Sequence, residues 1–580
     1  MKMNNKNITL IALFALLIIP LSCKKGFLNT TDTGAATADN AFGKSSSVVS
    51  LVNSIYNTFQ SSDMLKKSIW YYANYETHDF FNNGADIVWN YYGIQSDFYA
   101  LPTFWNNSYI GIIRANNALG IIQNAMAKGV VTQALGTRLE GEVYFLRGLI
   151  YYYLAGSFGG VPLELNASSN GLTPRSTQDQ VFAQVVADMK QAENLLVSKT
   201  QLASTDLGRA TKGAAYAYEG AAQMWLKNYT GALAAFNNPE LTSNYHLLQN
   251  FMDVGEYSNQ NNDESIFEVQ FLVTGNQSWG DGWQDGGEEG WIDDFDWPQE
   301  ISGFGYDYAN PGLWYSYQSG DLRKQATILG PGDQNMSPDI LAKWGGIKGY
   351  AVVQANYQSN PTTYSDGAGN PINTCGTLTH PWYGTDGTPR SGYYDAKKWR
   401  DPTLTGANGS GAIFGGQNQI LMRYAEVLLD RAECKIRTGD VAGGLADIQT
   451  VRNRAWGGTA PAVMQDGLTW DGKATTPITD PLQMVYSEYR HELTAEYSTF
   501  YDLRRAGPGV AAAFIQSAYG TQAGNTNQIT YPYGPTADGK THGVWNTTLP
   551  VNKDILPIPA ASIGLNPNLT QNQGNVKFFS

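Results

Sequence analysis

The sequence predicts a mostly α-helical protein: a tetratricopeptide-like scaffold of helical repeats that carries a large, irregular, loop-rich lobe. Apolar residues recur at three- and four-residue spacing through two regions of the 580-residue chain, at about 48–236 and 419–455. Between them, residues 237–415 are rich in Gly, Asn, Asp, Pro and aromatic residues and show little sustained period. A segment of this length without periodic structure is more often functional than accidental, so we place the ligand site in this lobe.

The first helical region contains several separate periodic stretches. Each predicts an amphipathic helix, at 109–127, 135–155, 177–196 and 210–225. Residues 208–237 are typical of a helix–turn–helix unit, with alanine-rich packing faces and a break near Asn228-Tyr229.

The second helical region predicts another helix pair. One helix is expected to end at Thr438-Gly439-Asp440, and a second follows it. The small residues Ala432, Ala442 and Ala446 allow the two helices to pack closely. Such spacing is typical of tetratricopeptide units, which run about 34 residues and stack into a scaffold. The tail, 521–580, predicts loop and short turns.

The N-terminus has the pattern of an export signal. Lysines precede a mostly apolar run at 8–19, which is too short to span a bilayer as a helix. The run ends in Leu21-Ser22-Cys23, a lipobox-like junction, so we expect cleavage before Cys23 and lipid attachment to it. Two or three acyl chains would hold the protein stably, because each buried methylene contributes roughly 0.8 kcal/mol. Residues 23–47 then form a tether.

Composition excludes several classes of function. The net charge of −13 and a pI near 4.9 argue against a nucleic-acid surface. The 5 His residues show no paired metal spacing, so we expect no metal and no cofactor. Cys375 and Cys434 are too few for a disulfide framework.

Short blocks along the chain carry a family likeness, and they occur at LEGEVYFLRG (139–148), FGGVPL (158–163), GRATK (208–212), LMRYAEVLL (421–429), YDLRR (501–505) and NPNLTQN (566–572). With them the chain resembles the SusD/RagB family of outer-membrane lipoproteins of Bacteroidetes. The resemblance covers essentially the whole mature chain. It implies an N-terminal helical region at 48–236, a ligand-binding lobe at 237–415 and a C-terminal region at 416–580, after a signal peptide at 1–22.

The resemblance also implies a function. Such a protein would sit on the outer membrane through Cys23, facing the cell exterior, above a SusC-like TonB-dependent barrel. It would capture an oligosaccharide and pass it to the barrel for import, without catalysis. The charged residues of the shared blocks lie on or beside apolar helical faces, where buried charge must be paired. We therefore expect ion-pair or helix-capping roles for them: Arg147, Arg423, Glu426, Asp502, Arg504 and Arg505.

Aromatic residues in two loop-like segments predict the glycan site. A flat ring can cover the C–H face of a sugar, while amides and carboxylates bind its hydroxyls. The first segment, 275–317, supplies Trp279, Trp283, Trp291, Trp297 and Tyr306. The second, 70–105, supplies Asp79, Asn82, Trp89, Tyr91 and Tyr92, whereas Trp105 and Tyr109 begin a helix and are expected to pack inward.

Three alternatives stay open. The acidic residues at 281–296 provide carboxylates for a glycoside hydrolase, which needs two of them across a cleft. The same residues could hold calcium, although their spacing does not fit an EF-hand loop and a solvated acidic loop is favoured. A helical-repeat scaffold that binds a peptide or protein nutrient is the third.

Overall fold

The computed structural model describes residues 41–82, 85–272, 307–329, 416–469, 474–519, 549 and 553–572, and short strand segments at 363–365, 371–373, 382–383, 389–390, 394–395, 528–529 and 545–546. The predicted signal, Cys23 and the tether up to residue 40 lie outside the described residues. So do 273–306, which contain most of the tryptophan-rich segment. Among the residues described, no helix is long and apolar enough to cross a membrane.

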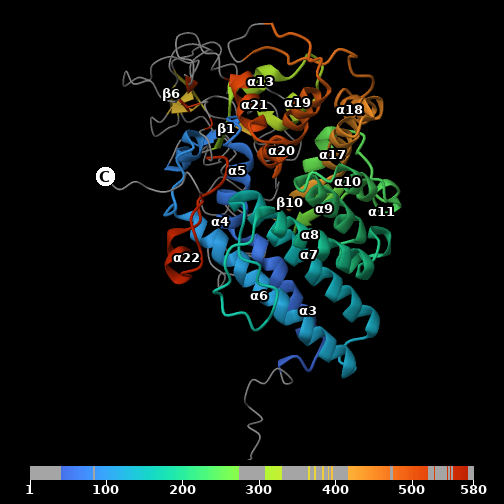
Figure 1. Cartoon of the computed structure of the whole chain (residues 1–580). Coiled ribbons are helices and arrows are strands. Elements are labelled where there is room, and N and C mark those ends of the chain that lie inside the picture. The colour runs from blue at the N-terminus through green and yellow to red at the C-terminus, as the bar shows by residue number, and fades with distance from the viewer. Residues whose placement is uncertain are drawn as a thin grey trace, which may run out of the picture.

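The predicted helical scaffold is confirmed. Its helices are α3 (Ser45–Tyr56), α6 (Ala100–Ala127), α7 (Gln133–Phe158), α8 (Gln178–Leu195), α9 (Lys212–Trp225), α10 (Tyr229–Phe236), α17 (Tyr424–Arg437) and α18 (Val441–Ala455). Neighbours pack side by side in the order α6, α7, α8, α9, α10, α17 and α18. The two helical regions of the sequence thus form one continuous array (Figure 1). Helix α10 packs directly on α17, although residues 237–415 separate the two regions in the sequence.

Helix ends lie where local sequence places them. Thr177 accepts from the Gln180 backbone N–H, and the Gln180 side chain accepts from the Thr177 N–H, which forms a capping box at the start of α8. Asn228 caps α10 at the predicted break. Gly439, at φ 98°, follows α17 in a conformation that favours glycine, and Asp440 then caps α18.

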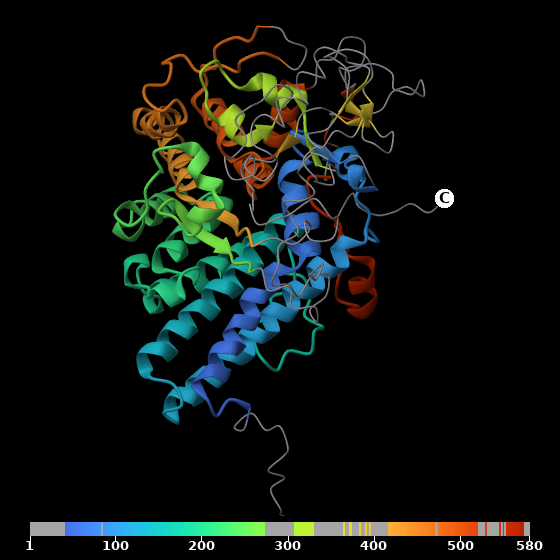
Figure 2. The same ribbon diagram turned by 180° about the vertical axis from the view of Figure 1, so that it is seen from behind.

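Most of the remaining helices lie in the upper part of the molecule in Figure 1, while α11 lies at its right edge and α22 at its left edge. The remaining helices are α4 (Ser62–Met64), η2 (Leu65–Trp70), α5 (Tyr71–Asn74), α11 (Pro239–Thr242), α13 (Pro311–Ser316), α14 (Arg323–Thr327), α19 (Pro481–Leu493), α20 (Thr499–Ala506), α21 (Val510–Tyr519) and α22 (Ala560–Leu565). The short 3-10 helices are η1 (Asn57–Gln60), η3 (Ala85–Tyr91), η4 (Lys199–Gln201), η5 (Ser204–Asp206), η6 (Phe251–Gly255) and η7 (Tyr257–Asn259). Segments 62–74 (blue) and 481–519 (orange to red) lie together there, far apart in sequence (Figure 2).

Two sheets join distant segments. One has the order β1-β3-β9-β4, from β1 (Phe80–Asn82), β3 (Asp307–Ala309), β9 (Tyr394–Asp395) and β4 (Ile328–Leu329). The other pairs β2 (Ser265–Val269) with β10 (Gln419–Arg423), antiparallel. The smaller pairs are β5 (Thr363–Ser365) with β6 (Pro371–Asn373), β7 (Trp382–Tyr383) with β8 (Pro389–Arg390), and β11 (Gln528–Ile529) with β12 (Trp545–Asn546).

The second helical region begins later than predicted. The expected helical region begins at Gln419, yet residues 419–423 form strand β10 and the helix begins at Tyr424. All five strand residues are buried, and their backbone groups bond to β2. A fully buried strand has no alternation, so its apolar run cannot be distinguished from helix by periodicity.

Candidate functional site

Strands β1 and β3 bring the two predicted aromatic segments together. They pair antiparallel, with Phe80 opposite Ala309 and Asn82 opposite Asp307. The last residue of β1, Asn82, lies opposite the first residue of β3, Asp307, at one end of this strand pair. Strand β3 belongs to the 275–317 segment, and the predicted ligand residues Trp279 to Tyr306 precede it in the sequence. We call this place the β1–β3 edge; β1 lies at the upper left of Figure 1.

Asp307 holds the β1–β3 edge in place through buried polar contacts. Its carboxylate accepts hydrogen bonds from the Asn82 amide, at 2.8 Å, and from the Tyr75 hydroxyl. The ammonium group of Lys66 lies 3.1 Å from the other carboxylate oxygen, and neither side chain is exposed. Lys66 also lies over the Trp70 ring, 3.4 Å from its centroid. Asn82 is therefore engaged in a buried polar cluster.

Asp79 belongs to a second buried cluster at the start of β1. An Nη atom of Arg490 lies 2.7 Å from its carboxylate, and the Tyr519 hydroxyl donates to it at 2.5 Å. Asp79 itself has no exposed surface. The pair ties β1 to α19 and α21, which explains a carboxylate at this position without a ligand.

Trp89 and Tyr92, two of the predicted loop residues, are both buried, and Trp89 lies in a short helix and not in a loop. Trp89 lies in η3 with no exposed surface, and its ring packs against Tyr71, Tyr72 and Phe98 at 5.7–6.4 Å. The Tyr92 hydroxyl donates to the Glu76 carbonyl at 3.2 Å. Neither ring offers a free face in this structure, and burial argues against direct contact with a ligand.

The other predicted ligand residues are not described. Trp279, Trp283, Trp291, Trp297 and Tyr306 lie outside the described residues, as does the side chain of Tyr91. Contact between these residues and a glycan stays a prediction. By contrast, Trp105 and Tyr109 pack inward at the start of α6, as expected: Trp105 is 6% exposed and contacts Tyr109 and Phe158.

One titratable pair lies beside this edge. The Tyr99 hydroxyl donates to both carboxylate oxygens of Asp86, at 3.0 and 3.2 Å. Burial raises the pKa of Asp86 to about 6, although the hydrogen bond from Tyr99 partly opposes that shift. Tyr99 is 48% exposed, so the pair is reachable from solvent.

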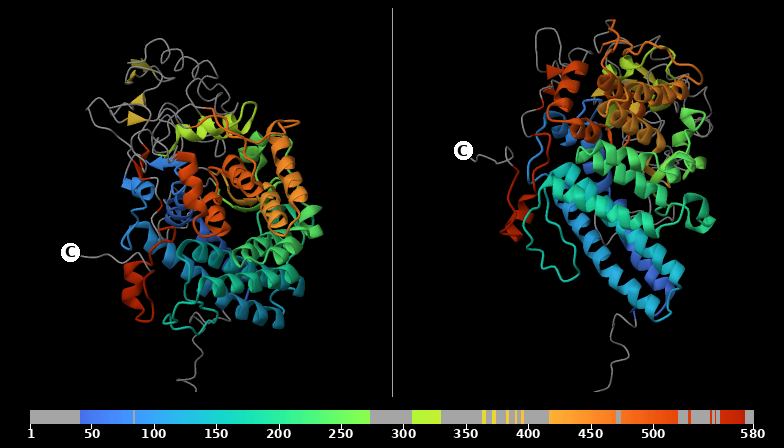
Figure 3. Two further views of the ribbon diagram at one scale, coloured as in Figure 1. Left: turned by 45° about the horizontal axis from the view of Figure 1, so that its top comes forward. Right: turned by 45° about the vertical axis from the view of Figure 1, so that its right-hand side comes forward.

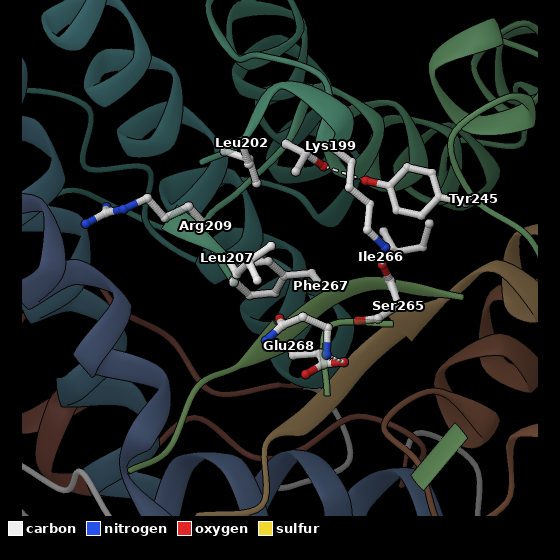
Figure 4. A pocket seen from close by; sticks show the side chains of 12 residues that line it. Lys199, Leu202, Leu207, Arg209, Tyr245, Ser265, Ile266, Phe267 and Glu268 are labelled. Atoms are coloured by element: carbon white, nitrogen blue, oxygen red, sulfur yellow. Dashed lines mark hydrogen bonds between the residues drawn. The ribbon is translucent and has the colours of Figure 1, made fainter. Parts of the chain in front are cut away.

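Three hollows lie elsewhere among the described residues. One, of 640 Å³, is lined by α6, residues 162–171 and α22. Another, of 540 Å³, lies between residues 50–60, residues 205–209 and β2. The third holds only 30 Å³, about one water molecule. Figure 4 shows this small hollow between Lys199, Tyr245 and Phe267, with Arg209 extending away from it. Sequence reasoning missed all three, because their walls come from segments that only the fold assembles.

Family models match both halves of the chain. The model described as "SusD family" matches residues 246–574, and one described as "Starch-binding associating with outer membrane" matches 27–226. The first covers more than half of the sequence. The chain belongs to the SusD family.

Individual relatives agree with this assignment. A SusD-like protein, P25, of Formosa agariphila is 27% identical over 170 residues, which are 29% of this chain and 31% of the relative. A SusD-like protein of Bacteroides ovatus is 25% identical over 185 residues, 30% of this chain and 33% of the relative. The matched stretches thus span about a third of each of these relatives.

Solved structures show the same fold. A laminarin-binding SusD-like protein superposes with a TM-score of 0.65 at 21% identity, covering 92% of this chain and 99% of that one. Surface glycan-binding protein A from Bacteroides fluxus gives 0.63 at 20% identity, with 92% and 99% covered. The SusD-like fold therefore extends over nearly the whole chain.

The charged residues of the SusD-family blocks are structural, as predicted. Arg147 pairs with Asp188 at 2.6 Å between α7 and α8. Arg505 lies 2.8 Å from Asp430 and 3.0 Å from Asp502. Arg504 donates to the Tyr72 hydroxyl at 2.8 Å and lies near Asp554.

Glu426, another charged residue of these SusD-family motifs, lies in a buried group of three carboxylates. It lies in the first turn of α17, where the positive end of the helix dipole favours a carboxylate. One carboxylate oxygen from each of Glu426, Asp430 and Asp502 comes within 4.8 Å of the others. Burial, and then the carboxylates of Asp502 and Asp430, raise the pKa of Glu426 well above its usual range. Burial and the two neighbouring carboxylates therefore favour the protonated form of Glu426, while Arg505 favours the charged form.

Arg423 forms the centre of a large ion-pair network among the described residues, and it connects β10 to α19. Its guanidinium lies 2.6 Å from Glu264, 2.6 Å from Glu492 and 2.8 Å from Glu496, with its side chain fully buried. Arg454 pairs with Glu264 and Glu492, and Arg323 pairs with Glu488 and Glu492. This SusD-family arginine thus holds β2, β10, α18 and α19 together.

Proposed function

We propose that this protein is a lipid-anchored, outer-membrane glycan-binding protein that captures an oligosaccharide and delivers it to a SusC-like TonB-dependent transporter. Membership of the SusD family supports the class. The names of its relatives support the ligand, since one binds laminarin and others are surface glycan-binding proteins. The acyl chains on Cys23 would hold it at the membrane.

The pairing of β1 with β3 is the observation that carries the proposal. It supports the proposal because β3, the described part of the 275–317 segment, lies beside β1 of the 70–105 segment, next to buried ion pairs. A rigid base lowers the entropy cost of presenting aromatic rings to a sugar. Each ring that covers a sugar face buries roughly 50 Å², worth about 1 kcal/mol. Several rings together give the micromolar affinity that we expect.

The proposal assigns binding and no catalysis. A neutral oligosaccharide offers hydroxyls and C–H faces, and aromatic, amide and carboxylate side chains recognise both. The described residues of the β1–β3 edge place their carboxylates, Asp79 and Asp307, in buried ion pairs with Arg490 and Lys66. Such paired carboxylates are held for structure and not for proton transfer to a ligand.

Calorimetry of the mature protein with laminarihexaose and maltohexaose tests this function. The double variant Trp283→Ala/Trp291→Ala should lose binding while its thermal unfolding stays unchanged. Trp456→Phe, a half-buried tryptophan at the end of α18, is the matched control and should bind as the wild type does.

Other results would contradict the proposal. Retention of peptides but no glycan would favour the scaffold alternative. Release of reducing sugar that depends on the acidic residues at 281–296 would show a hydrolase. Unchanged affinity in the double variant would show that these two rings are not the platform.

A further inference from the structure

The 640 Å³ hollow is assembled from three segments that are distant in the sequence. Its walls are the first half of α6, residues 162–171 after α7, and α22 with the residues up to Leu569. Figures 1 and 3 show α22 (red) beside α6 (blue) and the teal segment that follows α7. The volume lies within the roughly 300–1,000 Å³ typical of small-molecule sites. We call it the α6–α22 hollow.

Buried polar groups line this hollow without full partners. Asn107 is 6% exposed, and within the described part of the chain its amide makes no hydrogen bond. Glu164 is 5% exposed; Ser169 donates to one of its carboxylate oxygens, and the other accepts nothing from the residues described. The indole N–H of Trp105 likewise has no acceptor among those residues. The unpaired atoms of Asn107, Glu164 and Trp105 reach solvent, so they are available to a bound molecule.

The walls are held rigidly around these groups. The Tyr109 hydroxyl donates to the Pro162 carbonyl at 2.9 Å. The Glu164 carbonyl accepts from the Asn116 amide at 2.9 Å and from the Tyr151 hydroxyl at 3.1 Å. On the opposite side, Asn566 donates to the Thr173 carbonyl at 3.0 Å. A site that is fixed before binding loses little conformational entropy on binding.

The chemistry of the lining matches an uncharged, hydroxyl-rich ligand. Glu164 is the one charged side chain among the described lining residues, and its free oxygen is an acceptor for a hydroxyl. Asn107 offers both a donor and an acceptor, and Trp105 offers a donor. Apolar surface lies beside them, because Ile113 is 51% exposed and Leu565 is 81% exposed. Such surface covers the C–H face of a sugar ring.

We propose that the α6–α22 hollow is a second sugar-binding site, separate from the β1–β3 edge. One sugar unit lies in the hollow, with a hydroxyl donating to Glu164, and Asn107 and the Trp105 indole donating to sugar oxygens. The ligand class rests on the proposed function, whereas the position and its residues rest on the hollow itself. Two separate sites on one chain would hold a long glycan at two points, so its overall affinity would exceed that of either site alone.

Calorimetric stoichiometry with trisaccharides tests this site, because a trisaccharide is too short to occupy two separate sites at once. The mature wild-type chain should bind two equivalents of laminaritriose or of maltotriose. Asn107→Leu, which keeps the size and removes the amide, should lose one equivalent or weaken it about tenfold. Glu164→Gln should weaken the same equivalent, because a charged acceptor makes the stronger hydrogen bond.

The control is Asn117→Ala, an exposed residue of the same helix outside the hollow, and it should bind as the wild type does. Thermal melts of the variants show that each is folded. If the wild type binds one equivalent, which Trp283→Ala/Trp291→Ala removes and Asn107→Leu leaves intact, the second site is wrong and the proposed function stands. If the wild type binds neither trisaccharide nor any longer glycan, both fall.

Discussion

Replacing Arg423 by methionine should destabilise the protein severely. The guanidinium is fully buried and contacts three carboxylates, from Glu264, Glu492 and Glu496, at 2.6–2.8 Å. Methionine fills much of the same volume but leaves those carboxylates with one cation fewer. Arg454 still reaches Glu264 and Glu492, whereas Glu496 loses the contact that Arg423 makes with it at 2.8 Å. Removing one partner of a buried ion pair costs about 3–5 kcal/mol, and we expect a loss in this range.

The loss should depend on pH in a defined direction. Burial favours the protonated form of Glu492, but the guanidinium groups of Arg454, Arg423 and Arg323 hold its pKa well below the usual range. A carboxyl whose folded pKa is depressed contributes stability that is complete above the unfolded pKa, near 4.3, and is lost as pH falls through the folded value. The difference between wild type and Arg423→Met should therefore be full at pH 7 and should narrow below about pH 4.

Urea unfolding, followed by circular dichroism at pH 7 and pH 3.5, measures both effects. The partner variant is Glu496→Gln, which removes a carboxylate charge that Arg423 contacts at 2.8 Å. In the double variant the loss should be smaller than the sum of the two single losses, because each single variant already breaks the contact between these two side chains. A loss below about 1 kcal/mol for Arg423→Met would contradict this prediction, since the network would then contribute no more than an exposed ion pair.

Two further predictions concern other elements. Burial and the neighbouring carboxylate of Glu219 raise the pKa of Glu193 to about 9. Because this folded pKa lies above the unfolded one, the contribution of Glu193 to stability is complete below about pH 4 and falls as pH rises toward 9. The Glu193→Gln variant should therefore have the same urea midpoint as the wild type at pH 4 and a higher one at pH 8. A Cβ on Gly444 would lie 2.8 Å from the Ala432 carbonyl oxygen, in the backbone of α17, so Gly444→Ala should cost about 1–3 kcal/mol. Gly120→Ala in α6 meets nothing within 4 Å and should stabilise by up to about 1 kcal/mol; equal thermal shifts for the two glycine variants would contradict the packing argument.

The helical scaffold was predictable because its signals are local. Threonine, asparagine and aspartate caps stand where helices α8, α10 and α18 begin, and the apolar period continues between the caps. Pairing of the buried charges was also predictable, since an arginine on an apolar face must find a carboxylate. The identity of the partner was not: Arg423 pairs with Glu264, 159 positions away, through β2 and β10.

The candidate site was less predictable because exposure is a property of the fold. Asn82, Asn83 and Gly84 are typical turn residues, so the sequence near Trp89 predicts a loop. In the structure the adjacent short helix η3 turns Trp89 into a core of tyrosines, and Asp79 becomes the anchor of β1. Composition alone does not distinguish an aromatic residue that binds a ligand from one that packs beneath a binding loop.

The buried residues at the β1–β3 edge still bear on function. Asp79 joins β1 to α19 through Arg490, and α19 also carries Glu492, which pairs with Arg423. The Arg423 network and the anchor of the β1–β3 edge therefore share one helix. Under the proposed function, a change in that network, such as Arg423→Met, would act on ligand affinity through the position of β1 and not through contact with the ligand. Loss of binding in such a variant thus needs a stability measurement beside it before it locates a site.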